Sequence, residues 1–458
     1  MESLKCREIL EATGGTLAFG DAELDICSIS TDSRRIGKGA LFIPIAGERF
    51  DGHDFITSSL EAGAAASLTQ SRLIPTVPGK AVIRVCDTVE ALGKIAKYYR
   101  KKFGIPFVGI TGSVGKTSTK DMVAEVLACS FNVLKTKGNF NNEIGLPLTI
   151  FNIDRSHEAA VIEMGMSGFG EISRLTSIVR PNIAIITNIG LSHIEKLGSR
   201  QNILKAKLEI LEGLDNGGIV VLNGDDKLLY GIKDLVSFKT IFYGMEEGLD
   251  YQAFNIKTEG EKGTGFELTV NGRDYKIHVP VPGLHNVYNA LAAVAAGLEL
   301  GMDMDSVING IARFTPSKMR MDIIKHKGAT IINDTYNASP QSMEAAINVL
   351  KEVAGSNRTI AVLGDMLEMG EWAFNAHVDV GIFAVSREID YILTVGESGR
   401  NIAVGAIEAG AEKCRVHSFE KNEDAAGFLK ELFKKGDVIL VKGSRGMKME
   451  EIIERFTA

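Results

Sequence analysis

The residues best suited to chemistry lie between positions 107 and 118, where Gly112 and Gly115-Lys116-Thr117 follow a short apolar run. Residues 106–110 predict a buried strand, and residues 118–128 predict a helix. A glycine-containing turn between them lets backbone N–H groups converge on phosphates, beside the positive end of the helix. Lys116 would neutralise phosphate charge, and the Thr117 hydroxyl could bind magnesium. We expect a nucleotide to be bound by Gly112, Ser113, Val114, Gly115, Lys116, Thr117 and Ser118.

This turn departs from the common phosphate-loop pattern G-x-x-x-x-G-K-[ST]. The position that would carry the first glycine is Ile110, and the turn has Gly112 instead, three residues before Gly115. The strand, turn and helix around it still favour nucleotide binding.

Length and composition indicate an ordinary soluble enzyme. The 458 residues suffice for about three domains of ~150 residues each. The net charge of −7 argues against a general nucleic-acid binder. The five scattered cysteines suggest neither a disulfide framework nor a zinc site. Because the start lacks a signal-peptide pattern and no run of 18 apolar residues occurs, we expect a cytosolic protein without membrane association.

The pattern of elements predicts an α/β protein of three domains. Residues 1–100 predict a small α/β domain, with short strands and turns alternating over residues 31–53. Residues 101–312 predict a doubly wound parallel sheet around the nucleotide loop. Residues 313–458 predict a Rossmann-like unit, which lacks the G-x-G-x-x-G of dinucleotide binders.

Several polar residues of the central domain fall where predicted strands end. Strands are predicted at residues 132–135, 159–164, 183–187 and 218–222. Glu163, Asn188 and His193 lie at or just beyond such ends, where ligands gather in parallel sheets. Asn271-Gly272 predicts a hairpin turn, and an Ala-rich helix is predicted to follow residues 283–289.

Taken together, these stretches resemble the Mur ligase family, the ATP-dependent amide-forming enzymes of peptidoglycan synthesis. The resemblance covers essentially the whole chain. It rests on residues 111–117, on Val161-Ile162-Glu163-Met164-Gly165, on Thr187-Asn188 with His193, and on residues 283–290. Within the family, residues 334–340 (DTYNASP) and 363–370 (LGDMLEMG) resemble the member that adds D-alanyl-D-alanine to UDP-N-acetylmuramoyl-tripeptide.

The resemblance implies ATP and Mg²⁺ as cofactors and assigns roles around them. Thr117, Glu163 and His193 would hold magnesium. The family has a carbamylated helix lysine in this region. Lys205 and Lys207 lie two apart on a helix, so at most one can face the site, and the spacing against residues 208–210 favours Lys207. Asn286, Asn289, Arg320 and Asp334 would contact ATP, with Arg320 reaching the γ-phosphate across a hinge near residue 312.

The resemblance also implies substrate contacts in all three domains. Ser33, Arg34, Gly52 and His53 resemble a uridine-diphosphate pocket. Asn139, Asn141 and Asn142 would contact the sugar–peptide part, although three asparagines within four residues could equally form a turn cluster. In the C-terminal domain the expected contacts are Asn337, Lys442, Ser444 and Arg445.

Three alternatives follow from the same residues. Folylpolyglutamate synthetase shares the chemistry and the last two domains, but it lacks a uridine-binding first domain. A GTPase-like switch would need an Asn-Lys-x-Asp motif, which the sequence lacks. A structural ATPase without a substrate would not need the asparagine cluster or residues 442–445. We expect a monomer.

Overall fold

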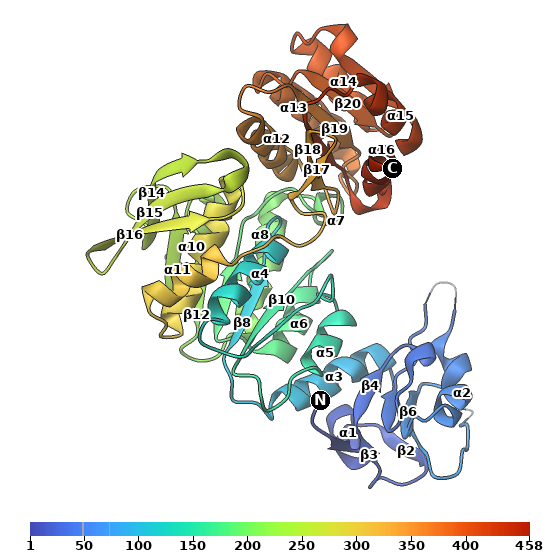
Figure 1. Ribbon diagram of the computed structural model, residues 1–458. Helices are drawn as coiled ribbons and strands as arrows, with labels where there is room; N and C mark the ends of the chain where they lie inside the picture. The colour runs from blue at the N-terminus through green and yellow to red at the C-terminus, as the bar shows by residue number, and fades with distance from the viewer. Residues whose placement is uncertain (48–49, 73) are drawn as a thin grey trace.

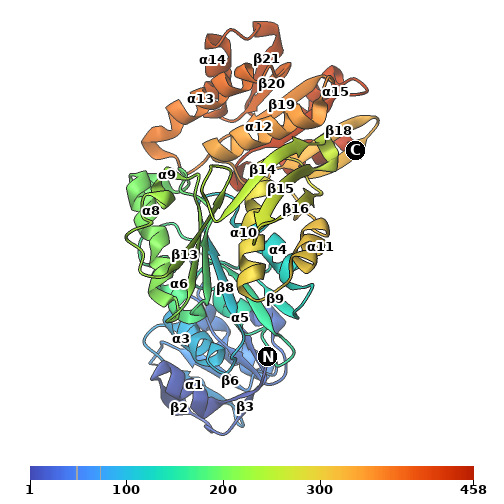
Figure 2. The same ribbon diagram turned by 90° about the vertical axis from the view of Figure 1, so that its left-hand side faces the viewer.

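The computed structural model describes residues 1–47, 50–72 and 74–458 as three lobes, each built on its own β-sheet (Figure 1). We call them the N-terminal, central and C-terminal lobes, and Figure 2 shows them stacked along the long axis with the central lobe in the middle. Each helix in the described part of the chain is too short or too polar to cross a membrane.

The N-terminal lobe contains a five-stranded sheet and a short two-stranded one. The larger sheet has the order β2 (Thr16–Phe19), β7 (Ala81–Arg84), β6 (Ala66–Thr69), β5 (Ala40–Phe42) and β4 (Ser28–Ser30). β1 (Leu4–Lys5) pairs with β3 (Asp25–Ile26), and the helices are α1 (Cys6–Thr13), α2 (Ile56–Glu61) and α3 (Thr88–Arg100).

The alternation of strands and turns predicted over residues 31–53 is only partly correct. β5 forms, but residues 33–35 and 52–55 are short 3-10 turns. Asp32 and Asp51 accept hydrogen bonds from the backbone N–H groups of Arg34 and His53, which favours a turn over an extended chain. Residues 48 and 49 of the predicted segment lie outside the described residues.

The central lobe has a nine-stranded sheet with the phosphate-loop strand inside it. The order is β16 (Arg273–Val279), β15 (Thr264–Val270), β14 (Tyr251–Thr258), β13 (Lys239–Gly244), β12 (Ile219–Asn223), β11 (Ile183–Ile186), β8 (Phe107–Thr111), β10 (Ala159–Glu163) and β9 (Val133–Lys135). The seven strands from β14 to β9 in this order, β8 included, are parallel. β15 and β16 extend the same sheet beyond β14 in antiparallel fashion. The predicted turn at Asn271-Gly272 joins β15 to β16, and both residues have positive φ.

Helices cover both faces of this sheet because its strands are apolar on both sides. On one face, Val108 and Ile110 pack with α4 (Lys116–Leu127), α10 (His285–Glu299) and α11 (Met304–Ala312). The other face, which includes Phe107, packs against α5 (Gly145–Ile150) and α6 (Glu171–Val179). Shorter helices follow the strands: α7 (Ile194–Leu197), α8 (Arg200–Leu208) and α9 (Lys227–Tyr230).

The C-terminal lobe is a six-stranded sheet with helices on both sides. Its order is β17 (Asp322–His326), β18 (Ala329–Asp334), β22 (Val438–Lys442), β19 (Thr359–Gly364), β20 (Tyr391–Val395) and β21 (Val416–Phe419), with only β17 antiparallel. The helices are α12 (Pro340–Ala354), α13 (Ala373–Ser386), α14 (Gly399–Glu408), α15 (Asn422–Leu432) and α16 (Glu450–Thr457).

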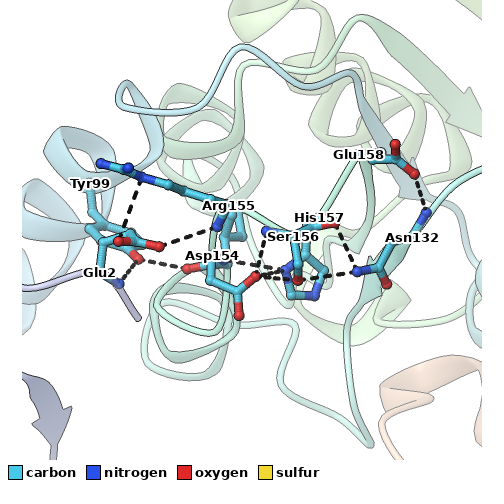
Figure 3. A network of polar contacts seen from close by, with 9 residues as sticks. Glu2, Tyr99, Asn132, Asp154, Arg155, Ser156, His157 and Glu158 are labelled. Atoms are coloured by element: carbon cyan, nitrogen blue, oxygen red, sulfur yellow. Dashed lines mark hydrogen bonds and ion pairs between the residues drawn. The ribbon is translucent and has the colours of Figure 1, made fainter.

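The N-terminal lobe is fastened to the central lobe through α3. Tyr99, fully buried, donates a hydrogen bond from its hydroxyl to the Ile153 carbonyl (2.6 Å) and accepts one from the Glu2 N–H (2.7 Å). Glu2 in turn accepts from the Arg155 N–H, and Figure 3 shows these contacts continuing along residues 154–158. Arg100 donates to the Val179 carbonyl and lies over the Phe107 ring. This junction is closed and well packed.

Candidate active site

The turn after β8 requires its first glycine. Gly112 has φ of +150°, and a Cβ there would lie 1.9 Å from Thr187 Oγ1. Gly115, at φ +84°, directly precedes α4, so the helix begins at Lys116 rather than at Ser118 as predicted. The close approach of two neighbouring strands therefore explains why a glycine stands at position 112 and none is needed at Ile110.

Asn188 holds the turn in place. Its side chain accepts from the Val114 N–H (3.0 Å) and donates to the Val114 carbonyl (2.9 Å), and its own carbonyl accepts from the Ser113 N–H. Thr187 adds a hydroxyl donor to the Val114 carbonyl. The turn is thus fixed from the adjacent strand β11 before any ligand binds.

Lys116 curls back over this turn. Its ammonium donates to the carbonyl oxygens of Gly112 (2.8 Å) and Ser113 (3.2 Å). Burial lowers the pKa of Lys116, Glu163 opposes this shift, and Arg320 adds to it. A cation held over the mouth of a phosphate-binding turn can neutralise phosphate charge with little rearrangement.

A cavity of about 860 Å³ opens in front of the turn, between the central and C-terminal lobes. The predicted site residues on its wall come from both lobes. They are Ser113, Val114, Gly115, Lys116, Thr117, Ser118, Asn139, Asn141, Asn142, Glu163, His193, Asn286, Asn289, Arg320, Asp334, Asn337 and Lys442.

Glu163 is the best candidate cation ligand in this cavity. It is almost fully buried at the end of β10. Its Oε1 accepts a hydrogen bond from Asn141 Nδ2 (2.7 Å), while Oε2 has no hydrogen-bond partner among the described residues. A buried carboxylate oxygen without a partner is costly, and a hard cation such as Mg²⁺ would satisfy it. The residues present therefore fit a magnesium ion.

The two candidate lysines of α8 differ sharply in exposure. Lys205 is exposed, whereas Lys207 is 2% exposed and makes no hydrogen bond or ion pair with any described residue. Burial, reinforced by the charge of Lys116, lowers the pKa of Lys207 well below its usual value. A lower pKa increases the share of the uncharged amine, the form that reacts with CO₂.

His193 lies at the start of α7 with φ of +63° and lines the cavity. Burial and the charge of Lys116 lower its pKa, while Glu368 acts in the opposite direction. Its Nδ1 is 2.6 Å from Glu368 Oε2 of the C-terminal lobe.

On the other side of the turn, α10 presents a chain of amides. Asn289 Oδ1 accepts from the Thr119 hydroxyl (2.8 Å), and Asn289 Nδ2 donates to Asn286 Oδ1 (3.0 Å). Asn286 also donates to the Pro282 carbonyl. These contacts tie α10 to α4, the helix of the phosphate turn.

Arg320 and Asp334 reach the cavity from beyond the central lobe. Arg320 lies with its guanidinium 4.0 Å from the centre of the Tyr336 ring. Asp334 is paired with Lys442 (2.5 Å), its partner in the parallel register of β18 and β22. Lys442 also donates to the Asn337 carbonyl. Asp334 and Lys442, both predicted ligand contacts, therefore bind each other at this wall.

Three family models match the chain over most of its length. They are the Mur ligase family catalytic domain (residues 25–100), the Mur ligase middle domain (110–297) and the Mur ligase glutamate ligase domain (319–445). The chain belongs to the Mur ligase family.

Individual relatives match this Mur ligase from end to end. It is 43% identical, over 98% of its length and 97% of the relative's, to the UDP-N-acetylmuramoyl-tripeptide–D-alanyl-D-alanine ligase of Bacillus subtilis. A crystal structure of MurF from Acinetobacter baumannii is similar with a TM-score of 0.92, at 31% identity, over 100% of this chain and 99% of that one. The crystal structure of MurF ligase from Thermotoga maritima in complex with ADP is similar with a TM-score of 0.84, at 30% identity, over 94% of this chain and 97% of that one.

Of the predicted site residues of this Mur ligase that do not line the cavity, Lys207 lies on α8 and two others follow β22. Ser444 is buried and accepts a hydrogen bond from the Leu367 N–H (2.9 Å). Arg445 is exposed and pairs with Glu450 (2.6 Å). Both residues follow β22, whose last residue, Lys442, lines the cavity. Their own side chains contact other residues of the C-terminal lobe. Their substrate roles stay predictions.

The predicted uridine-diphosphate residues lie in the N-terminal lobe, apart from the cavity. The Arg34 side chain is 87% exposed and pairs with Asp32. His53 Nδ1 is bonded to Asp51, while His53 Nε2 accepts from the Gln70 N–H. Gly52 packs against the backbone of Ile45, and Ser33 begins a 3-10 turn. Their role likewise stays a prediction.

Asn188 lies where the sequence predicts it, just beyond the end of a strand beside the phosphate loop. Tyr336 and Glu368 were not among the predicted site residues. They lie in two of the segments that carry the family resemblance. Their partners, Arg320 and His193, lie in other segments of the chain. Only the fold brings those partners together.

Proposed function

We propose that this Mur ligase joins D-alanyl-D-alanine to UDP-N-acetylmuramoyl-tripeptide, with ATP converted to ADP and phosphate. The observation that carries the proposal is the cavity between two lobes, where a phosphate-binding turn meets a buried, half-satisfied carboxylate. Full-length identity of 43% to a ligase of that name supports the choice of substrates.

The chemistry needs an activated carboxyl group because a carboxylate is a poor electrophile. A carboxylate oxygen of the tripeptide attacks the γ-phosphorus of ATP, the bond to ADP breaks, and an acyl phosphate forms. The amine of D-alanyl-D-alanine then attacks the acyl carbon, and inorganic phosphate leaves with the oxygen it gained. The amine releases its proton in forming the amide.

Lys116 serves the first step by stabilising charge. Its ammonium, now on the carbonyls of Gly112 and Ser113, would turn to phosphates bound in front of the turn. Phosphoryl transfer depends mainly on positioning and charge neutralisation, which the N–H groups of the turn and Lys116 both supply.

Magnesium would be held by Thr117, Glu163, His193 and Lys207 carrying a carbamate. The unpartnered Oε2 of Glu163 and the buried, unpaired amine of Lys207 support this set. When bound there, a magnesium ion would shield the phosphate charge that develops during the transfer. A carbamate would give Lys207 the anionic oxygen that a hard cation prefers.

Asn286 and Asn289 would contact the adenine side of ATP, and Arg320 and Asp334 its γ-phosphate and ribose. Because the first pair belongs to the central lobe and the second to the C-terminal side, ATP would be enclosed by closure about a hinge near residue 312. The Arg320 guanidinium already faces the cavity over Tyr336.

The acceptor nucleotide would extend from this cavity to the N-terminal lobe. Ser33, Arg34, Gly52 and His53 would hold the uridine diphosphate. The sugar–peptide part would meet Asn139, Asn141 and Asn142, which line the cavity. Asn337, Lys442, Ser444 and Arg445 would serve the incoming dipeptide.

The three lobes would be domains spanning residues 1–100, 101–312 and 313–458. This division is supported by the sheets, since no described strand pairs across either boundary. The protein would act as a cytoplasmic monomer, a state that analytical ultracentrifugation can check.

Folylpolyglutamate synthetase chemistry is the alternative. The N-terminal lobe disfavours it, because residues 25–100 match the Mur ligase family's own first model and form a separate sheet.

A coupled ATPase assay tests the function. Phosphate release should require both UDP-N-acetylmuramoyl-tripeptide and D-alanyl-D-alanine, and mass spectrometry should detect the pentapeptide product. Phosphate release that folate stimulates, or that neither peptide substrate affects, would refute the proposal.

A further inference from the structure

Two residues from different lobes meet at the edge of the cavity. His193 Nδ1 and Glu368 Oε2 lie 2.6 Å apart, and their side chains are 24% and 58% exposed. Both residues have a left-handed backbone, with φ of +63° and +62°. A non-glycine residue keeps this conformation only where its surroundings hold it there.

The loop that carries Glu368 is fixed by two side chains. The Met366 N–H donates to His377 Nε2 (2.9 Å), and the His377 ring is locked by donation from Nδ1 to the Ala373 carbonyl (2.6 Å). The next N–H, of Leu367, donates to Ser444 Oγ. The backbone directly before Glu368 is therefore held at two successive N–H groups.

The segment that carries His193 is held from the other side. It follows Asn188, which clamps the phosphate turn, and it leads into α7. A Cβ on Gly370 would lie 3.0 Å from Glu195 Cγ, so the two loops are packed together beside the pair. The packing keeps α7 against the C-terminal lobe.

The pairing decides what His193 can offer to the cavity. A carboxylate at Nδ1 keeps the proton on that nitrogen, which leaves Nε2 with a lone pair. Nε2 makes no hydrogen bond to any residue in the described ranges. The imidazole is thereby oriented with a free acceptor nitrogen.

We propose that Glu368 is a positioning residue that orients His193 for cation binding and makes this orientation depend on closure of the C-terminal lobe. The proposal rests on the function proposed above. Because the two residues belong to different lobes, the pair exists only while the lobes are together. Cation binding and lobe closure would then favour each other.

The test compares Glu368→Gln and Glu368→Ala with Glu371→Gln. Glu371 is a matched control because it is an exposed carboxylate three residues away and makes no ion pair with any residue that the structure describes. Binding of Mn²⁺, used as a spectroscopic probe in place of Mg²⁺, is measured by electron paramagnetic resonance with ADP present, so no turnover is needed.

We expect Glu368→Ala to weaken Mn²⁺ binding and to lower kcat, each by about 10–100-fold. Glu368→Gln, which keeps an acceptor oxygen, should lose less. KM for the acceptor nucleotide should change little, and the melting temperature of Glu368→Gln should match that of the wild type. Small-angle scattering should show weaker contraction of Glu368→Ala with an ATP analogue and Mg²⁺.

Wild-type Mn²⁺ affinity in Glu368→Ala would overturn the proposal, and so would an equal loss in Glu371→Gln. If the wild type fails to join the two peptides, the proposed function fails, whereas the Mn²⁺ titration with ADP still reports on Glu368. The two failures are therefore distinguishable.

Discussion

The central lobe meets its two neighbours in different ways. Towards the N-terminal lobe, Tyr99 and Arg100 are buried in or beside an apolar core and bond to backbone carbonyls of the central lobe. Towards the C-terminal lobe there is a cavity, and ion pairs such as His193–Glu368 and Lys325–Glu261 link the two lobes. Besides these pairs, α7 packs against the segment around Gly370. A continuous, hydrogen-bonded junction resists opening more than one interrupted by a cavity, and exposed ion pairs contribute little.

The contrast indicates that the two junctions have different roles. The first junction fixes the N-terminal lobe at a set place on the central one. In the proposed function, the second would open to admit ATP and close to complete the site. Variants at the second junction should therefore change catalysis, and variants at the first should change stability.

The largest effect is expected from Lys116→Ala at the cavity. Loss of the cation that faces the phosphates should lower kcat roughly 10³-fold, with little change in melting temperature. Phosphate-release kinetics and thermal unfolding measure the two quantities. An enzyme that joins both peptides at the wild-type rate would contradict the role of Lys116.

Lys207→Met should separate catalysis from stability. Without the carbamate the rate should fall roughly 10²-fold. Because a buried amine without a partner is replaced by an apolar chain, the free energy of unfolding should be unchanged or rise by about 1 kcal/mol. Lys205→Met is the control, since Lys205 is exposed on the same helix. Equal loss of rate in both variants would argue against Lys207 as the modified residue.

Tyr99→Phe tests the closed junction. The Tyr99 hydroxyl donates to the Ile153 carbonyl and accepts from the Glu2 N–H. Its removal should therefore lower the free energy of unfolding by about 1–2 kcal/mol. Denaturant unfolding measures this, and kcat should stay near that of the wild type. Tyr98→Phe, which loses only a half-exposed bond to Glu8, should cost less. A Tyr99→Phe enzyme with weakened ATP binding would contradict the different roles of the two junctions.

The smallest effect is expected from Tyr336→Leu at the cavity. Loss of the ring beneath Arg320 removes about 1 kcal/mol of cation–π attraction, which should lower kcat/KM for ATP about fivefold. Tyr336→Phe keeps the ring and should behave like the wild type in steady-state kinetics. If Tyr336→Phe loses as much as Tyr336→Leu, the hydroxyl rather than the ring face matters.

Local patterns account for the elements that were predicted well. β10 and β11 start at residues 159 and 183, as predicted, and each ends one residue before its predicted end. β13 was not predicted. Its six residues have no strict alternation, and the strand is stabilised by its neighbours β12 and β14. The pairing of β13 with β12 and β14, rather than its local sequence, therefore accounts for this strand.

The sequence by itself determined the phosphate turn, the alternation of strands and helices, and the family, because these depend on residue type and short spacing. It also favoured Lys207 over Lys205 for the proposed carbamate. Tertiary structure alone decided which lysine is buried, that Asp334 pairs with Lys442 across 108 residues, and that Glu368 reaches His193. Such contacts depend on the register of distant strands and the packing of lobes, which local spacing does not encode.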